Sequence, residues 1–200
     1  MRTPGRVLTG ILLGAACAAF SSVAVAQTPQ NGAEEQSAPA SRFPCEEQEK
    51  FREFDFWIGK WDVHTADGAL AGKNVIESSH RGCVLIENWT GAGGSTGTSM
   101  NYFDAAADEW VQVWTDASGS QITIRGGLTD AGMLFEGQIH YTSNGITAPF
   151  RGLWTAQPDG RVRQFFEQSN DGGKTWEPWF EGYYSRAETA GRSDDDEDGG

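Results

Sequence analysis

The sequence predicts an all-β protein, a single antiparallel up-and-down β-barrel of about eight to ten strands with a short N-terminal helix. From Phe54 onward, about ten short strand-like runs follow one another, each bounded by Gly, Asp, Asn or Ser. The connectors, among them "ADG", "DASG", "TSNG" and "QPDG", supply the positive backbone φ that tight hairpins need. A sheet of that many strands would leave two exposed edges unless it closed on itself, so we expect a barrel.

The first 26 residues have the features of an export signal. Arg2 and Arg6 precede the apolar run "VLTGILLGAACAAF", which is too short to span a bilayer comfortably, and "AVA" predicts cleavage after Ala26. We therefore expect a periplasmic or secreted protein. Lipidation at Cys17 is the alternative, because "LGAAC" loosely resembles a bacterial lipobox.

Composition divides the remaining chain into three parts. Residues 27–45 are rich in Gln, Ala, Ser, Pro and Glu without apolar periodicity, which predicts a flexible linker. Residues 46–187 form one domain, large enough for a single core. It opens with "EEQEKFREF", Glu46–Phe54, a candidate helix that is acidic at its start and basic later and that is placed to cap one end of a barrel. Residues 188–200 form an acidic tail.

The net charge limits the partners. At −13, with no basic stripe, the chain should be repelled by nucleic acid and by anionic lipid. No stretch after the leader is apolar enough for a transmembrane helix.

Two cysteines remain after the leader, Cys45 and Cys83, and the sequence has no C-x-x-C motif. An even number of cysteines in an exported chain predicts a disulfide.

The segment "QSNDGGKTWEPW" contains Ser169, Asp171, Gly173 and Trp176 in the spacing S-x-D-x-G-x-x-W. This pattern resembles the Asp box of sialidases and related propellers. It occurs once, whereas a propeller repeats its blades, and no convincing pair of inward carboxylates accompanies it. We therefore predict a structural hairpin, with Asp171 accepting backbone N–H groups and Trp176 packing on the hairpin.

The motif Gly59-Lys60-Trp61 is a G-x-W at the beginning of the first predicted strand. It resembles the opening of lipocalins and other calycins. That resemblance implies that Trp61 closes one barrel end beneath a basic residue from a late strand, and Arg186 in "YYSR" has the matching chain position.

A broader resemblance covers most of 54–186. The segments "FDFWIGKWDV", "RVRQFFEQSNDGGKTW" and "FEGYYSR" resemble a bacterial family of uncharacterised, calycin-like domains that open with F-D-F-x-x-G-x-W. The resemblance implies a lipocalin-like barrel and no known activity, so no catalytic residues are carried over.

No metal or cofactor is expected. His64, His80 and His140 stand on separate predicted elements, and no H-x-H or H-E-x-x-H occurs. A haem ligand at His140 is the alternative to surface or hydrogen-bonded histidines. "GAGGSTG", residues 91–97, lacks the lysine of a phosphate-binding loop and is interpreted as a hairpin loop, with a lid at the barrel mouth as the alternative.

Aromatic residues carry the strongest hint of a ligand site. Eight tryptophans lie within the domain, and Trp110, Gln112 and Trp114 share one face of "EWVQVWTD". A cavity lined by tryptophan and one amide would suit a flat or long apolar ligand. The equally weighted alternative is that these tryptophans fill the barrel or form a belt outside it.

Charged residues on two late strands form a second candidate group. Arg163 and Glu167 alternate with Val162, Gln164 and Phe166, and Arg151 lies on the preceding predicted strand. Facing inward, these residues would line the cavity, and an unmatched arginine would hold a ligand carboxylate. The alternative is a structural Arg–Glu pair within the sheet.

Three functional hypotheses follow. The first is an exported calycin-like barrel that binds a small apolar or amphipathic molecule. The second is a cofactor-independent isomerase or hydratase that uses Glu167 or Glu87 as general acid/base. The third is a cell-envelope interaction module with a filled barrel.

Overall fold

The computed structural model describes residues 42–188. The predicted leader with Cys17, the linker up to residue 41 and the tail from residue 189 lie outside the described residues. The domain begins slightly earlier than the sequence predicts, because Pro44 and Cys45 already belong to helix α1 (Pro44–Glu47).

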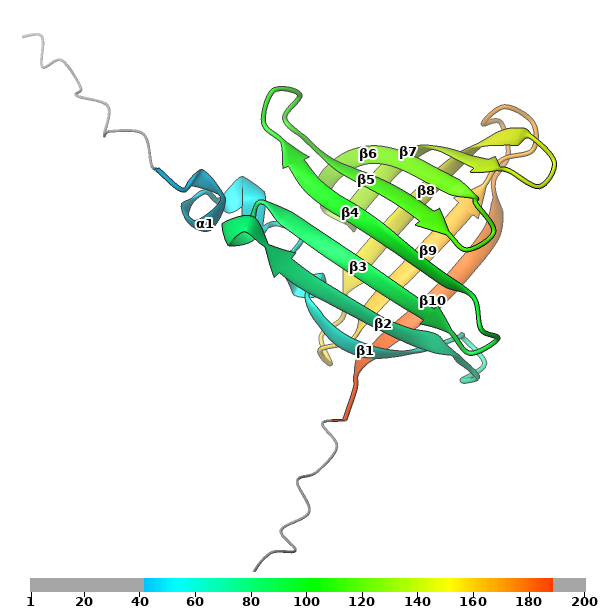
Figure 1. Ribbon diagram of the computed structural model, residues 1–200, viewed down its shortest axis with the longest axis horizontal. Helices are drawn as coiled ribbons and strands as arrows, with labels where there is room; N and C mark the ends of the chain where they lie inside the picture. Colours follow the sequence, from blue (N-terminus) through cyan, green and yellow to red (C-terminus); the bar gives the residue numbers. More distant parts are fainter. Residues whose placement is uncertain (1–41, 189–200) are drawn as a thin grey trace, which may run out of the picture. The chain divides into compact units, whose positions relative to one another are not determined.

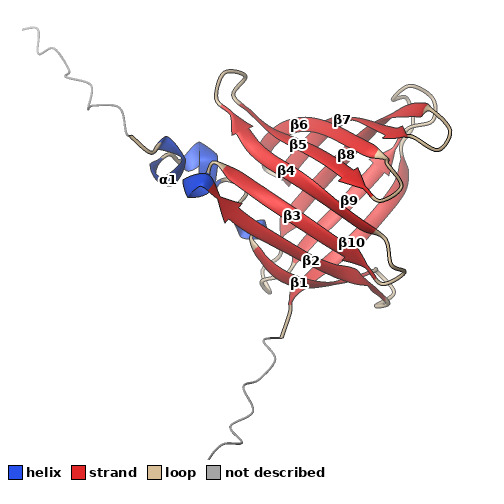
Figure 2. Ribbon diagram, viewed as in Figure 1, coloured by secondary structure: helices blue, strands red, loops and turns tan. Residues whose placement is uncertain are grey.

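The described chain forms a closed barrel of ten antiparallel strands, in which each strand pairs with its neighbours in sequence and β1 pairs with β10. Figures 1 and 2 show the strands wrapping around a common axis. This confirms the predicted fold class. The strands are β1 (Gly59–His64), β2 (Leu70–Ser79), β3 (Val84–Gly91), β4 (Thr96–Asp104), β5 (Glu109–Asp116), β6 (Gln121–Thr129), β7 (Gly132–Tyr141), β8 (Ile146–Ala156), β9 (Val162–Gln168) and β10 (Glu177–Arg186).

The segment before the barrel is not the single helix expected over Glu46–Phe54. Helix α1 is followed by two 3₁₀ turns, η1 (Glu49–Arg52) and η2 (Asp55–Trp57). The reason lies in the spacing of Phe51, Phe54 and Trp57, which recur every third residue. In 3₁₀ geometry, side chains three residues apart eclipse one another, so the turns favour pointing all three rings the same way. All three are buried.

These rings close one end of the barrel. Phe54 stacks on Trp57 with 4.9 Å between ring centroids and meets Trp110, Phe135 and Trp154 edge-on at 5.4–5.8 Å. Figure 1 shows α1 and the two turns, together called the N-terminal segment (residues 44–57) and coloured blue to cyan, at this end of the barrel. The predicted cap is therefore present, although its secondary structure differs.

Arg186 of β10 lies over Trp61 of the G-x-W motif. The Arg186 guanidinium lies 3.8 Å from the centroid of the Trp61 ring and donates to the Ile58 carbonyl at 2.7 Å. Gly59 has a φ of 147°, and a Cβ at this position would overlap that guanidinium. Glycine is thus required for the arginine to reach Trp61.

The predicted turn at Asp171 is confirmed as a hairpin loop between β9 and β10. The Asp171 carboxylate accepts the backbone N–H groups of Lys174 and Thr175 and the Thr175 hydroxyl. These hydrogen bonds, led by the Thr175 backbone N–H, lower the pKa of Asp171 to about 2. Trp176 lies under the Arg151 guanidinium, 4.3 Å from ring centroid to Cζ.

No helix among residues 42–188 is long and apolar enough to cross a membrane.

Cys45 and Cys83 form the predicted disulfide. It joins α1 to the turn η3 (His80–Gly82) and β3, and so holds the N-terminal segment against the closed barrel end.

Replacing both cysteines by serine should lower the free energy of unfolding by about 3–4 kcal/mol, because the bond closes a 38-residue loop in the unfolded chain. Urea titration of the wild type and of the Cys45→Ser, Cys83→Ser double variant measures this difference. The wild type in reducing agent should match the variant. A loss below about 1 kcal/mol would show that strain or residual structure offsets the chain entropy.

Candidate functional site

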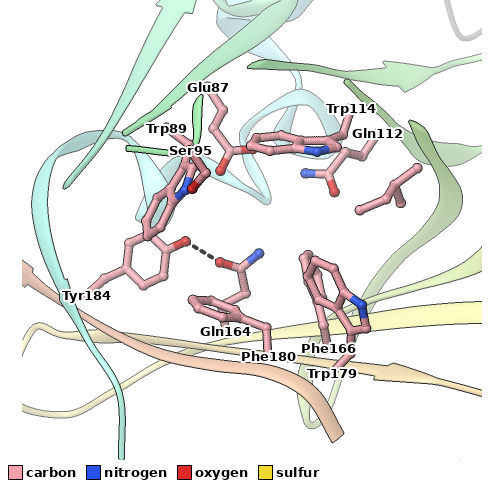
Figure 3. A pocket seen from close by; sticks show the side chains of 11 residues that line it. Glu87, Trp89, Ser95, Gln112, Trp114, Gln164, Phe166, Trp179, Phe180 and Tyr184 are labelled. Atoms are coloured by element: carbon pink, nitrogen blue, oxygen red, sulfur yellow. Dashed lines mark hydrogen bonds between the residues drawn. The ribbon is translucent and has the colours of Figure 1, made fainter. Parts of the chain in front are cut away.

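A cavity of about 300 Å³ occupies the barrel interior toward the end opposite the N-terminal segment. Ser95, in the β3–β4 loop, and the partly exposed Trp179 of β10 lie at its mouth, and Figure 3 shows the lining side chains converging on a common space. The lining residues are Glu87, Trp89, Ser95, Gln112, Trp114, Ile122, Gln164, Phe166, Trp179, Phe180 and Tyr184.

Strand β5 shows how the interior is layered. Trp110, Gln112 and Trp114 share the inward face, because side chains two residues apart point the same way along a strand. Trp110 lies against Phe54 and donates its indole N–H to the Lys50 carbonyl at 3.1 Å, so it belongs to the closed end. Gln112 and Trp114 line the cavity. The assignment of Trp110 as a lining residue is thus corrected.

Seven of the eight tryptophans divide between filling the barrel and lining a cavity, and the eighth, Trp176, lies under Arg151. Trp57, Trp61, Trp110 and Trp154 are buried in the core and fill the closed half. Trp89, Trp114 and Trp179 line the cavity of the other half. The interior is therefore not a filled barrel throughout.

Four aromatic rings of the cavity wall lie against glycines, three of them on a neighbouring strand and one, Gly182, on the same strand. In each pair, a Cβ on the glycine would overlap the ring, and glycine inside a strand often marks such a close approach. Because the rings lie against the backbone, they leave the middle of the barrel open. The pairs are Trp89 over Gly72, Trp114 over Gly97, Phe166 over Gly152 and Phe180 over Gly182.

Between the closed end and the aromatic wall lies a belt of buried polar side chains, with Glu87 as its centre. Glu87 accepts a hydrogen bond from Asn74 Nδ2 at 2.7 Å on Oε1 and one from Ser99 Oγ at 2.6 Å on Oε2. Both donors are buried and uncharged.

The belt continues on both sides of Glu87. On one side, Gln112 Nε2 donates to Asn101 Oδ1 at 2.8 Å. On the other side, Asn74 Nδ2 also donates to the Tyr184 hydroxyl at 3.2 Å, and that hydroxyl donates to Gln164 Oε1, the dashed contact in Figure 3. Polar groups from six strands thus meet at the floor of the cavity.

Burial controls the ionisation of this belt. Removal from water raises the pKa of Glu87 to about 7, and the hydrogen bonds from Ser99 and Asn74 offset only part of that rise. Burial, followed by the nearby Glu87 charge, raises the pKa of Tyr184 well above its ordinary range. Glu87 is therefore poised between its two protonation states near neutral pH, whereas Tyr184 stays neutral.

Arg151, Arg163 and Glu167 do not reach the cavity. On β9, Arg163 and Glu167 alternate with Gln164 and Phe166, which line it, and so face the outside of the barrel. Arg151 pairs with Glu167 at 2.7 Å, and Arg163 pairs with Glu181 at 2.7 Å. Their assignment as ligand-lining residues is corrected, and the alternative of structural ion pairs within the sheet holds. Glu167 is equally misplaced for acid–base chemistry inside the barrel.

The histidines also lie away from the cavity. His140 Nδ1 shares a hydrogen bond with the Thr147 hydroxyl at 2.8 Å, and His80 Nδ1 shares one with Ser79 Oγ at 2.8 Å. His64 lies at an outer groove beside Arg161. Within the described range 42–188, no group of three or more His, Cys, Asp or Glu residues could hold a metal ion.

Sequence reasoning named Glu87 as one of two possible acid–base residues but missed Asn74, Ser99, Asn101 and Gln164. Their signal was present, since each is a polar residue on the inward phase of a strand that also carries apolar or glycine residues there, with Ser99 and Asn101 together on β4. Without the inward phase of each strand, that signal could not be distinguished from an exposed polar position.

The fold and the cavity together define the class, a closed ten-stranded antiparallel barrel with an internal cavity. No protein-family model matches the chain, and no curated protein matches its sequence.

The free energy of unfolding should depend on pH through Glu87. Because the folded-state pKa of about 7 exceeds the ordinary value of 4.5, the contribution of the protonated carboxyl is fully present below about pH 4.5. It is lost as the pH rises through about 7, at a cost of about 3 kcal/mol. Urea titrations of the wild type and of Glu87→Gln at several pH values measure this cost. The difference between their free energies of unfolding should change between about pH 4.5 and about pH 7.

Glu167→Gln is the matched control, because Glu167 lies outside the barrel in an ion pair. If the free energies of unfolding of Glu87→Gln and the wild type differ by a constant amount from about pH 4 to about pH 8, the raised pKa of Glu87 is contradicted.

Proposed function

We propose that this protein is an exported, calycin-like barrel that binds a small, mainly apolar molecule with a polar end. The observation that carries the proposal is the cavity of about 300 Å³, which has an aromatic wall and a polar floor. Ligand sites are typically apolar concavities with a few convergent polar groups that fix orientation. Here the wall would hold the ligand body, and Glu87, Gln112 and Gln164 would orient its polar end.

Further features support the calycin-like and exported parts of the proposal. The pairing of Trp61 with Arg186 matches the closed barrel end that the G-x-W resemblance implies. The Cys45–Cys83 disulfide suits an oxidising compartment, as expected for the periplasm or the extracellular space. The apolar leader with its "AVA" site supports the same localisation.

Substitution of Trp114 by Ala should weaken binding of the uncharged fluorophore N-phenyl-1-naphthylamine by about tenfold, because the indole forms part of the wall. Arg163→Ala is the matched control. It lies on the outer face and should leave the affinity unchanged. Fluorescence titration measures both dissociation constants.

Gly97→Ala provides an independent variant, because a Cβ there would push the Trp114 ring from its place and narrow the cavity. Equal affinity in all four proteins, or no binding by the wild type, would overturn the proposed binding site.

A second candidate function is a cofactor-independent isomerase, and one observation favours it. Glu87 lines the cavity with a pKa of about 7, as a general base that works near neutrality requires. Its carboxylate would remove a proton from carbon in an apolar substrate, and the resulting acid would return that proton to another carbon.

This candidate predicts that the wild type converts a β,γ-unsaturated cyclic ketone to its conjugated isomer, followed by ultraviolet absorbance, and that Glu87→Gln reduces the rate by at least about 100-fold. N-phenyl-1-naphthylamine should still bind to the Gln variant. A wild-type rate equal to that of buffer would remove this candidate and leave the binding function standing.

A further inference from the structure

The cavity contains one acid and no base. Glu87 is the only residue of its lining that carries a charge when ionised near neutral pH, since Tyr184 stays neutral. No lysine, arginine or histidine of the described chain lines the cavity. Glu87 takes part in none of the ion pairs among the described residues.

The direction of the hydrogen bonds suits an ionised Glu87. Asn101 Nδ2 donates to the Leu85 carbonyl at 3.2 Å, which fixes the amide because a carbonyl can only accept. The same nitrogen donates to Ser99 Oγ at 2.8 Å, so the Ser99 proton is free to donate to Glu87 Oε2. Asn74 donates to the other carboxyl oxygen. Both hydrogen-bond partners thus present a proton to Glu87.

These neutral donors do not balance the charge. An ionised carboxylate removed from water is normally paired with a cation, because hydrogen bonds alone offset only part of the desolvation cost. That imbalance is visible in the raised pKa of Glu87. A second acceptor in the belt, Asn74 Oδ1, is buried without a hydrogen-bond partner. The floor of the cavity is therefore rich in acceptors and lacks a positive charge.

The wall suits a positively charged guest as well. Aromatic faces attract organic cations, and the effect is larger where water is excluded. Figure 3 shows Glu87 directed into the space that the rings of Trp89, Trp114 and Tyr184 border. The net charge of −13 also concentrates cations near the protein and repels anions such as fatty acids.

We infer that the cavity selects an organic cation, a primary or secondary amine on an aromatic or alkyl body, whose ammonium pairs with the Glu87 carboxylate while its body lies along the Trp89 and Trp114 rings. This inference rests on the proposed binding function and names the chemical class of the ligand. Glu87 acts here as the specificity-determining residue, and the aromatic wall supplies affinity that depends little on charge.

The test compares two probes of one shape, 2-(1-naphthyl)ethylamine and 2-(1-naphthyl)ethanol, by calorimetric titration at about pH 8. At this pH the alkylamine is protonated and Glu87 is ionised. The wild type should bind the amine at least about tenfold more tightly than the alcohol. In Glu87→Gln the affinity for the amine should fall to that for the alcohol, while the affinity for the alcohol should change by less than about twofold.

Glu167→Gln separates the local carboxylate from the net charge of the protein. It removes one carboxylate on the outer face and should keep the preference for the amine. Loss of the preference in this control would assign it to general electrostatic attraction and overturn the inference.

The remaining outcomes distinguish this inference from the proposal beneath it. Equal affinity of the wild type for amine and alcohol would overturn the preference for cations and leave the binding barrel intact. Binding of neither probe would count against the binding function itself. A preference that survives in Glu87→Gln would show that Glu87 is not its source. If Glu87→Gln fails to fold, the relative affinity of the wild type for the amine and the alcohol decides whether the cavity prefers cations.

Discussion

The insertion of the N-terminal segment into one end of the barrel is the packing interaction on which the rest of the structure depends. Phe54 is fully buried and contacts aromatic rings from η2, β5, β7 and β8. A barrel of ten strands has a wider interior than one of eight, so its own side chains fill it less readily. The inserted rings fill one half, and the Cys45–Cys83 disulfide holds the segment in place. The other half is thereby left to form a cavity with a closed floor.

The polar belt marks the boundary between these halves. A buried polar layer destabilises a core unless its members form hydrogen bonds, and here Asn74, Ser99, Asn101 and Gln112 do so around Glu87, with Asn74 Oδ1 left as an acceptor without a partner. Such a network also constrains the orientation of each member, which keeps the carboxyl of Glu87 directed into the cavity. Under the proposed function, the same residues serve both the fold and the orientation of a ligand.

The aromatic wall depends on glycine rather than on large side chains opposite each ring. Trp114 lies over Gly97 and Phe166 lies over Gly152, where any Cβ would push the ring inward. Large rings lying flat on a strand hold the cavity open, whereas the same rings directed across the barrel would fill it. The stability lost by glycine in a strand is the cost of keeping this space.

The sequence by itself determined the fold class, the disulfide and the Asp171 turn. These depend on local signals, namely alternation, turn residues and an even number of cysteines, whereas the pairing of Arg186 with Trp61 was expected only from the resemblance of the G-x-W motif to calycins. Only the tertiary structure decided which face of each strand points inward. That decision placed Arg151 and Arg163 outside the cavity and Glu87 within it. Trp110 and Trp114 share the inward face of β5 and differ in their position along the barrel, where Trp110 packs against Phe54 and Trp114 lines the cavity. The physical reason is that a strand with apolar residues on both faces satisfies either phase locally, so the choice is made by barrel closure and by packing against the inserted N-terminal rings.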